Sequence, residues 1–451
     1  MTSTAVAQPL TGEETLAPTV KGGKRAIGIL ALAQSVDFTE PQILNSMFPA
    51  IQASLNLADS ALGYLTAVKR GVEILSVFFW GLMSDRFRRK EVLAASTLLG
   101  AVASILTGFA PQFAIFFVVT VMINLGTAAM EGQTNSVMSD FYPLKERGKA
   151  FGILRGLAYS GLIFALIYFS LLADNMPALG WRIAYWSFGV LGLAASFTIW
   201  RLLDEPTRGQ TEQALADVPL DVIQKQGSHA FSVRQALNQF RVPTIIVDCL
   251  DLILLGFPKI MLVNFSVTFF VKVRGIREGE AILITLLGLI GFIIGSMTGG
   301  VVGDRMGGRL GEKARLITGH VVLVLLIITT YLIFGVSFNS IPLYMAVAFA
   351  TAFCVEFMYS ITRVVVSTAL LPEVRTVGFS IGRMADSFGS ILASLIYAVI
   401  VGPLGIAQSV LWLSIGGGVV AFVLYFGYYL TFARDAAWMQ QRLAQRAAES
   451  K

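Results

Sequence analysis

The sequence is poor in charged residues. Of its 451 residues, 14% are charged and 55% are hydrophobic, and the mean hydropathy is +0.71. Soluble domains carry about 25% charged residues. A chain this long with so little charge cannot cover its hydrophobic residues with a polar surface, which excludes an ordinary soluble protein. We therefore expect lipid to solvate much of the chain, and at about 20 residues per membrane helix about twelve helices fit.

Cysteine and histidine are scarce as well. Cys249 and Cys354 lie inside apolar runs, which is typical of free buried thiols. The two histidines belong to no His/Cys cluster, so we expect no metal site and no cofactor, and His320 is interpreted as a packed polar residue. No nucleophile–base pair appears, so an enzyme is not expected. A Gly-x-x-x-x-Gly-Lys-Ser/Thr loop is also absent, so ATP-driven pumping would need another subunit.

Apolar stretches separated by short breaks predict an all-α membrane protein of twelve transmembrane helices in two six-helix bundles. The first set is expected near residues 26–54, 60–83, 91–112, 114–139, 149–172 and 182–203. The second set is expected near residues 243–271, 280–303, 315–336, 341–370, 377–401 and 406–433. The predicted regions are a disordered tail (1–25), a first bundle (26–204), a linker (205–241), a second bundle (242–434) and a tail helix on the membrane surface (435–451).

Lysine and arginine predict the orientation in the membrane. Basic residues collect in the breaks after the second, fourth and eighth predicted helices, whereas most breaks on the other side carry almost no charge. The exception is the break after the seventh helix, which holds Lys272, Arg274 and Arg277. Because basic loops stay in the cytoplasm, we expect both termini to be cytoplasmic and the protein to lie in the cell membrane. The net charge of +6 needs no nucleic acid to explain it.

The two halves of the sequence repeat each other. Gly81 and Asp85-Arg86 follow the second predicted helix of the first half, and Gly300 and Asp304-Arg305 follow the second helix of the second half. The two aspartates lie 304 − 85 = 219 residues apart, about half the chain. A second repeated pattern relates the segments Pro143…Arg147…Phe151…Arg155 and Pro372…Arg375…Phe379…Arg383. Parallel repeats with a site between the halves are typical of secondary transporters.

These motifs resemble those of the major facilitator superfamily. Residues 81–90 resemble its loop signature, residues 300–305 the second-half counterpart, and Pro143–Gly148 its turn between helices four and five. The resemblance implies a cytoplasmic gate of charge pairs and helix-end contacts that form and break as the halves rock. The candidate gating residues are Gly81, Asp85, Arg86, Arg147, Gly300, Asp304, Arg305 and Arg375.

Within this superfamily, the first half resembles the spinster-like lipid transporters. Glu40 stands nine residues before Pro49 and Glu131 lies in the fourth helix, as acidic residues do in that subfamily. The chain departs from it at Asn124, where the subfamily has an arginine, and at Lys69, Arg70 and Glu73, which stand at usually uncharged positions. The fourth helix also resembles that of organic-anion symporters, and the Gly-Pro signature of drug antiporters is missing from the fifth.

Ionisable residues inside the predicted helices are the candidate functional residues. Each costs about 2.5–3.5 kcal/mol when it faces lipid unpaired, so they are expected to face one another or a water-filled cavity. In the first half they are Asp37, Glu40, Lys69, Arg70, Glu73, Glu131 and Arg155. The spacings of Asp37–Glu40, Arg70–Glu73 and Lys69–Glu73 place each pair on one helix face. Four carboxylates against three cations leave one carboxylate without a full partner.

A carboxylate without a cation can take up and release a proton, so these residues predict proton coupling. Glu40 is the first candidate, Glu131 the second and Asp37 the third, and Pro41 favours a kink beside Glu40. The alternatives are static salt bridges that fix helix packing and, for Asp37, a place near the membrane surface. The candidate substrate-binding residues are Lys69, Arg70, Glu73, Asn124, Arg155, Lys259, Glu356 and Arg383.

The second half holds a further set of charges. Lys259 takes the place of Glu40 at the 219-residue offset, and Glu356 lies seven residues before Arg363 on one helix face. Arg383 and Asp386 are three residues apart and are expected to neutralise each other. Asp248 is open to two interpretations, a solvated helix end or an intramembrane carboxylate, and Asp251 lies one turn deeper. Glycines at 291, 295, 299 and 303 predict a smooth stripe for close helix packing.

The sequence therefore predicts a monomeric secondary transporter in the lipid bilayer, with protons and an amphiphilic or anionic small molecule as its partners. An uncoupled facilitator and a multidrug or lysolipid efflux carrier remain alternatives within transport. A receptor or scaffold that kept the fold without transport is the alternative from another class, against which both Asp-Arg loops argue.

Overall fold

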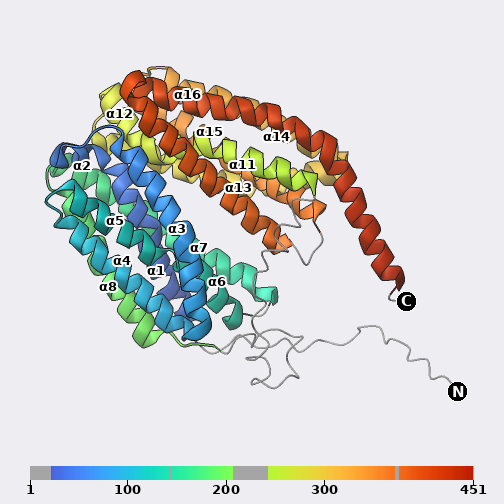
Figure 1. Cartoon of the computed structure of the whole chain (residues 1–451), viewed down its shortest axis with the longest axis horizontal. Coiled ribbons are helices and arrows are strands. Elements are labelled where there is room, and N and C mark those ends of the chain that lie inside the picture. The colour runs from blue at the N-terminus through green and yellow to red at the C-terminus, as the bar shows by residue number, and fades with distance from the viewer. Residues whose placement is uncertain (1–21, 143, 207–241, 371–374, 450–451) are drawn as a thin grey trace.

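The computed structural model describes residues 22–142, 144–206, 242–370 and 375–449, and regular structure in these ranges is helical (Figure 1). This confirms the all-α prediction. The expected N-terminal tail up to residue 21, most of the expected linker (207–241) and the turn residues Pro143 and Pro372 lie outside the described residues.

The described residues of the first half, 22–142 and 144–206, form eight helices. They are α1 (Gly23–Ser46), α2 (Phe48–Leu55), α3 (Ala61–Arg86), α4 (Arg89–Gly108), α5 (Phe113–Thr127), α6 (Met130–Phe141), α7 (Leu144–Asn175) and α8 (Gly180–Leu202). The first and fourth predicted helices are each divided, the first at Met47 and the fourth after Thr127. The break at Met47 follows from Pro49, which has no N–H to donate to the carbonyl four residues earlier.

The second half repeats this pattern. Its helices are α11 (Pro243–Ile260), the π-helix η2 (Met261–Phe265), α12 (Ser266–Arg274), α13 (Glu278–Leu310), α14 (Glu312–Gly335), α15 (Ile341–Ala369) and α16 (Arg375–Glu449). Pro258 interrupts the hydrogen bonds of α11 just before η2. Gly405 bends α16 with φ 74° and ψ 169°, a conformation open to glycine, between the last two predicted membrane helices. The expected tail helix is the continuous end of α16.

Within the part of the chain that the structure describes, eight helical segments are long and apolar enough to cross a membrane. Helices α1, α3 and α11 are not among them, although they overlap predicted membrane helices. Each of these three carries at least three charged residues, and all three contribute to the site described below. The count of twelve crossings stays a prediction.

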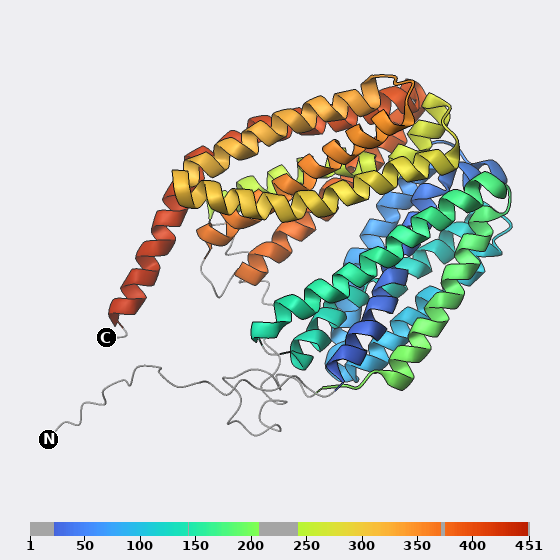
Figure 2. The same ribbon diagram turned by 180° about the vertical axis from the view of Figure 1, so that it is seen from behind.

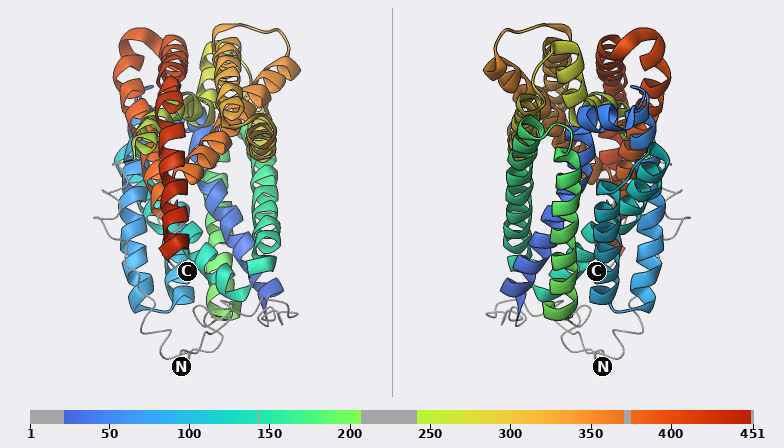
Figure 3. Two further views of the ribbon diagram at one scale, coloured as in Figure 1. Left: turned by 90° about the vertical axis from the view of Figure 1, so that its right-hand side faces the viewer. Right: turned by 90° about the vertical axis from the view of Figure 1, so that its left-hand side faces the viewer.

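The helices form two bundles, α1–α8 and α11–α16. The bundles meet at the end that carries α2 and α12 and diverge toward the end where α1 begins and α16 ends (Figures 1 and 2). The side views show the same arrangement (Figure 3). One hydrophobic cluster contains side chains of both bundles, among them Ile43, Phe48, Phe265 and Tyr397. We call the two ends of the molecule the joined end and the divergent end.

The predicted glycine stripe of α13 does pack closely, against α15. A Cβ atom on Gly291 or Gly295 would lie 2.4 Å from the backbone oxygen of Phe349 or Phe353, and one on Gly299 would lie 2.8 Å from that of Phe357. Only glycine permits these approaches, so the packing prediction is confirmed at these three positions.

Candidate functional site

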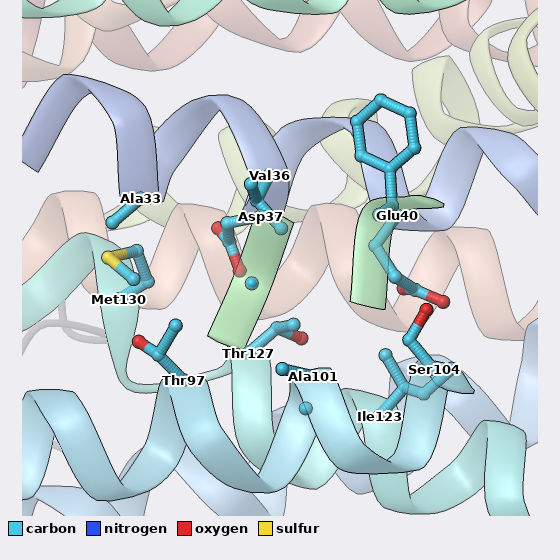
Figure 4. A pocket seen from close by; sticks show the side chains of 13 residues that line it. Ala33, Val36, Asp37, Glu40, Thr97, Ala101, Ser104, Ile123, Thr127 and Met130 are labelled. Atoms are coloured by element: carbon cyan, nitrogen blue, oxygen red, sulfur yellow. The ribbon is translucent and has the colours of Figure 1, made fainter. Parts of the chain in front are cut away.

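Glu40 lies inside the N-terminal bundle and lines a small cavity of about 20 Å³ (Figure 4). The cavity is bounded by residues of α1, α4, α5, α6 and α8, and Asp37, one turn before Glu40, also lines it. Glu40 is 3% exposed, and neither of its carboxylate oxygens has a hydrogen-bond partner among the described residues. Asp37 is half-buried. Burying a carboxylate without hydrogen bonds is costly unless it is paired with a cation or neutral.

Helix α3 brings its cations toward these acids. Arg70 Nη1 lies 2.9 Å from Glu73 Oε2, which confirms the predicted pair one turn apart. Lys69 of α3 is 7% exposed and interacts electrostatically with Glu40 of α1. Asn124, predicted to bind substrate, is buried and donates its amide hydrogen bond to the Thr120 carbonyl at 2.9 Å.

Glu131 joins the two bundles. One of its carboxylate oxygens lies 3.1 Å from Arg155 of α7, and the other lies 2.5 Å from Arg383 of α16. The two arginines are the matched residues of the repeated segments, and here they converge on one carboxylate. Their side chains are 42% and 66% exposed, so a solute between the bundles can reach them. Asp37 interacts electrostatically with Glu131, which links this ion pair to α1.

Asp386 has a partner on another helix. Its carboxylate accepts hydrogen bonds from Lys259 Nζ of α11, at 3.0 and 3.2 Å, and from the hydroxyl of Tyr359 of α15. Lys259 also lies over the ring of Tyr359, 4.3 Å from its centroid. The prediction that Arg383 and Asp386 neutralise each other is therefore wrong, since each has found an opposite charge on a different helix.

Glu356 and Arg363 of α15 both act electrostatically on Tyr159 of α7. Tyr159 stacks on Phe38 of α1, with the ring centroids 5.2 Å apart. These interactions place Glu356 near the boundary between the bundles, and its role in substrate binding stays a prediction.

The candidate gating residues lie at the divergent ends of α3, α7, α13 and α16. Arg86 and Arg305 are exposed, and Gly300 is half-buried within α13. The side chains of the others lie outside the described part of the structure, and gating by them stays a prediction. They are Gly81, Asp85, Arg147, Asp304 and Arg375.

Arg89, at the end of the same motif, was not predicted as a functional residue. It is 4% exposed, and its Nη1 atom lies 2.5 Å from Asp140 Oδ2 of α6 and 2.8 Å from Ser136 Oγ. Its Nη2 atom donates to the Pro206 carbonyl at 3.1 Å, and its backbone N–H donates to Glu205. Arg89 thus ties α4 to α6 and to the end of α8. The only signal in the sequence was the presence of three arginines in this motif, at positions 86, 88 and 89. The sequence does not show which of them is buried.

Polar contacts close the joined end. Asn45 donates to Asn264 at 3.2 Å, and these residues are 264 − 45 = 219 positions apart, so they are equivalent in the two halves. Ser170 donates to the Gly279 carbonyl, and the Gly279 N–H donates to Asp174. All three contacts run between the bundles.

An ion pair also closes this end. Lys272 lies 2.6 Å from Asp59, and although burial raises the pKa of Asp59, hydrogen bonds from Lys272 and Gln52 outweigh it and lower the pKa below its usual value. Arg274 donates to the carbonyls of Phe334 and Val336. Arg277 pairs with Glu280. The three cations that break the charge pattern of the loops are therefore all held by partners.

His320 is a packed residue, as predicted. Its ring nitrogens lie 3.0 Å from the Tyr429 hydroxyl and 3.2 Å from the Phe422 carbonyl, among aromatic rings of α16. No group of three His, Cys, Asp or Glu side chains in the described ranges is placed to hold a metal ion.

Residues 30–334 match the sequence profile of the Major Facilitator Superfamily, over two thirds of the chain. The chain belongs to this superfamily. Solved structures that are similar to this chain include that of a bacterial homologue of the human lysosomal transporter Spinster, in an inward-facing, occupied conformation. That structure has a TM-score of 0.74 at 17% identity and covers 92% of this chain and 99% of its own. The D-xylose–proton symporter has a TM-score of 0.65 at 15% identity, covering 88% of this chain and 96% of its own.

Curated relatives match over shorter regions. A probable 4-methylmuconolactone transporter of Cupriavidus pinatubonensis is 24% identical over 34% of this chain and 36% of its own. A probable sulfoacetate transporter of Cupriavidus necator is 26% identical over 41% of each chain. The synaptic vesicle 2-related protein of Bos taurus is 28% identical over 34% of this chain and 27% of its own. The matched regions thus span about two fifths or less of these relatives.

Proposed function

We propose that the protein is a proton-coupled secondary transporter of a small organic anion, with twelve membrane crossings and both termini in the cytoplasm. The observation that carries this proposal is the placement of the intramembrane charges. Arg155, Glu131 and Arg383 meet where the two bundles face each other, so the cost of burying them is offset by pairing at a site that both bundles share.

The conformation corresponds to an inward-facing state in this proposal. The ends of α3 and α4 carry Arg86, Arg88 and Lys90 at the divergent end, and basic residues stay on the cytoplasmic side. The joined end would then face outward, closed by Asn45–Asn264 and Asp59–Lys272. Alternating access would follow from rocking the bundles about the central charges.

The substrate class follows from the two arginines. Each is partly exposed, and in this conformation both are occupied by Glu131. An anion that entered between the bundles would compete with Glu131 for these guanidinium groups, which bind carboxylates, sulfonates and phosphates through paired hydrogen bonds. A relative that is named as a sulfoacetate transporter supports an organic anion as the cargo.

Glu40 is the proposed proton carrier. It is buried, has no hydrogen-bond partner among the described residues, and lies one turn from Asp37, which interacts with Glu131. If Glu131 loses an arginine partner, its negative charge near Asp37 is less neutralised. Proton uptake by Asp37 or Glu40 is then favoured. Binding of the anion and of the proton would thereby support each other.

The test is uptake into vesicles containing the purified protein, with sulfoacetate as the first anion and lysophospholipids as the second probe. One proton carried down a difference of one pH unit supplies about 1.4 kcal/mol, enough for about tenfold accumulation. We expect Glu40→Gln to abolish this accumulation and to leave anion exchange at equal pH intact, because glutamine resembles the protonated acid.

The matched control is Glu91→Gln, which changes an exposed carboxylate at the start of α4 and should accumulate the anion like the unmodified protein. Accumulation that persists in Glu40→Gln would reject Glu40 as the carrier. Equilibration without any dependence on the pH gradient would instead identify an uncoupled facilitator.

A further inference from the structure

Two carboxyl groups lie inside the C-terminal bundle, away from the charges shared by the bundles. Asp248 and Asp251 of α11 are one turn apart, and their residues are 4% and 0% exposed. The neighbouring Leu252 and Leu255 belong to a hydrophobic cluster that includes side chains of α14, α15 and α16. The interpretation of Asp248 as a solvated helix end is therefore wrong, since it is buried.

The two carboxyl groups differ in their partners. Asp248 accepts a hydrogen bond of 2.9 Å from the Tyr428 hydroxyl and interacts electrostatically with Arg363. Neither oxygen of Asp251 has a hydrogen-bond partner in the described part of the chain. Asp251 is therefore the less satisfied of the two.

The ionisable groups that face Asp251 are acids and phenols. Its own helix contributes Asp248, α15 contributes Tyr359, and α16 contributes Tyr425 and Tyr428. The nearby cations are engaged elsewhere. Lys259 binds Asp386, Arg363 acts on Asp248, and Arg315 of α14 donates to the Gly303 carbonyl.

A second observation comes from another helix. The hydroxyl of Tyr425 is fully buried, has no partner among the described residues, and interacts electrostatically with Asp251. It fits only because residue 319 is glycine, since a Cβ atom there would lie 2.0 Å from this hydroxyl. Buried hydroxyls normally have a hydrogen-bond partner, and this one lies near a second unpartnered polar group, the carboxyl of Asp251.

We propose that Asp251 is a second proton-binding site of the transporter, located in the C-terminal bundle and occupied by a proton in this conformation. An ionised carboxylate without a cation is strongly disfavoured in an apolar interior, and the neutral acid is not. A metal cation suits the site poorly, because it needs several oxygen ligands, and no group of three His, Cys, Asp or Glu side chains among the described residues is placed to hold one.

Tyr359 connects this site to the boundary between the bundles. Its hydroxyl donates to Asp386, the partner of Lys259, and it interacts electrostatically with Asp251. A rotation of the Tyr359 hydroxyl from Asp386 to Asp251 would stabilise the Asp251 carboxylate. The Asp251 acid would then pass its proton to water, giving the carboxylate and hydronium.

Infrared spectroscopy of the purified full-length protein tests the site without any substrate. A protonated buried carboxyl gives a carbonyl stretching band, separate from the bands of carboxylates, that shifts in heavy water. We expect this band at neutral pH, and we expect Asp251→Asn to remove one component of it. The matched control is Asp435→Asn, because Asp435 accepts hydrogen bonds from the Thr244 N–H and hydroxyl, as an ionised group does.

A second variant guards against loss of folding in Asp251→Asn. Tyr425→Phe keeps the carboxyl and removes the nearby hydroxyl, so the Asp251 component should remain and shift in frequency. The proposal is overturned if Asp251→Asn retains the whole band, or if Tyr425→Phe leaves the band unshifted. The proposal rests on proton coupling for its role, but Glu40→Gln removes a different component, so the two sites can fail independently.

Discussion

Arg89 shows how one residue of a charged loop differs from its neighbours. Arg86 and Arg88 are exposed, whereas Arg89 is 4% exposed and binds Asp140, itself 8% exposed. A buried ion pair adds little stability over an apolar pair, but the loss of one member leaves the other charge buried and uncompensated. Arg89 therefore fixes the relative positions of α4, α6 and the end of α8, although its net contribution to stability over an apolar residue is small.

We predict that Arg89→Ala lowers the free energy of unfolding by about 3–5 kcal/mol, because it breaks the buried ion pair with Asp140 by removing one member. Denaturant unfolding in detergent, followed by tryptophan fluorescence, measures the change. Arg88→Ala is the control and should change stability by less than about 0.5 kcal/mol, as an exposed residue does. Equal losses in the two variants would contradict the role of the buried pair.

Residue pairs were predictable from sequence only within one helix. The spacing of Arg70 and Glu73 determines their distance along a helix face, and the pair is present. The same spacing suggested Arg383 with Asp386, yet each has its partner on another helix. Spacing limits which groups can meet but does not rank a neighbour on the same helix against one brought close by packing. Glu131 and Arg383 are 252 residues apart in sequence, so no local spacing predicted their pairing.

The helices α1 and α11 show the repeat at the scale of elements. Each is interrupted near the joined end, α1 at Met47 and α11 at the π-helix η2, and each interruption follows or precedes a proline. Asn45 and Asn264 lie beside these interruptions and bind each other. The apolar stretches in the sequence predicted both helices. The internal breaks arise from single prolines that lack an N–H donor, and hydropathy averaged over many residues does not detect them.

The contact between α3 and α16 depends on Gly63. A Cβ atom on Gly63 would lie 2.6 Å from the Ser394 carbonyl oxygen and 2.8 Å from Ala398 Cβ. We predict that Gly63→Val costs the joined end about 1–3 kcal/mol through overpacking and shifts the population toward a state that is open there by about fivefold or more. Spin labels on exposed Ala58 and Arg277, one in each bundle, would report the longer distance.

Gly71→Val is the matched control, since it lies on the same helix and a Cβ atom there meets nothing within 4 Å. It carries the same change in helix propensity and should leave the label distance as in the unmodified protein. A shift of the same size in both variants would show that the helix itself, and not its contact with α16, responds.

At the scale of the molecule, the two-bundle arrangement follows from the sequence, but the conformation does not. The 219-residue repeat, the charge-poor helices and the basic loops are visible in the sequence, and they predict two halves with a shared site. Which ends of the bundles touch depends on small differences between two sets of contacts. The pairs Asp59–Lys272 and Ser170–Gly279 favour closure of the joined end, and they join residues whose encounter no local pattern predicts.

These contacts must break in every cycle if the bundles rock. We predict that a short thiol crosslinker between Asp59→Cys and Lys272→Cys stops net uptake in proportion to the fraction linked, because the replaced side chains touch at 2.6 Å across the bundles. Cys249 and Cys354 would first be replaced by alanine. Binding of the anion, measured by thermal shift, should persist because the divergent end stays accessible. Asp59→Cys alone, treated with the same reagent, should transport normally, and uptake by the linked protein would refute rocking about the central charges.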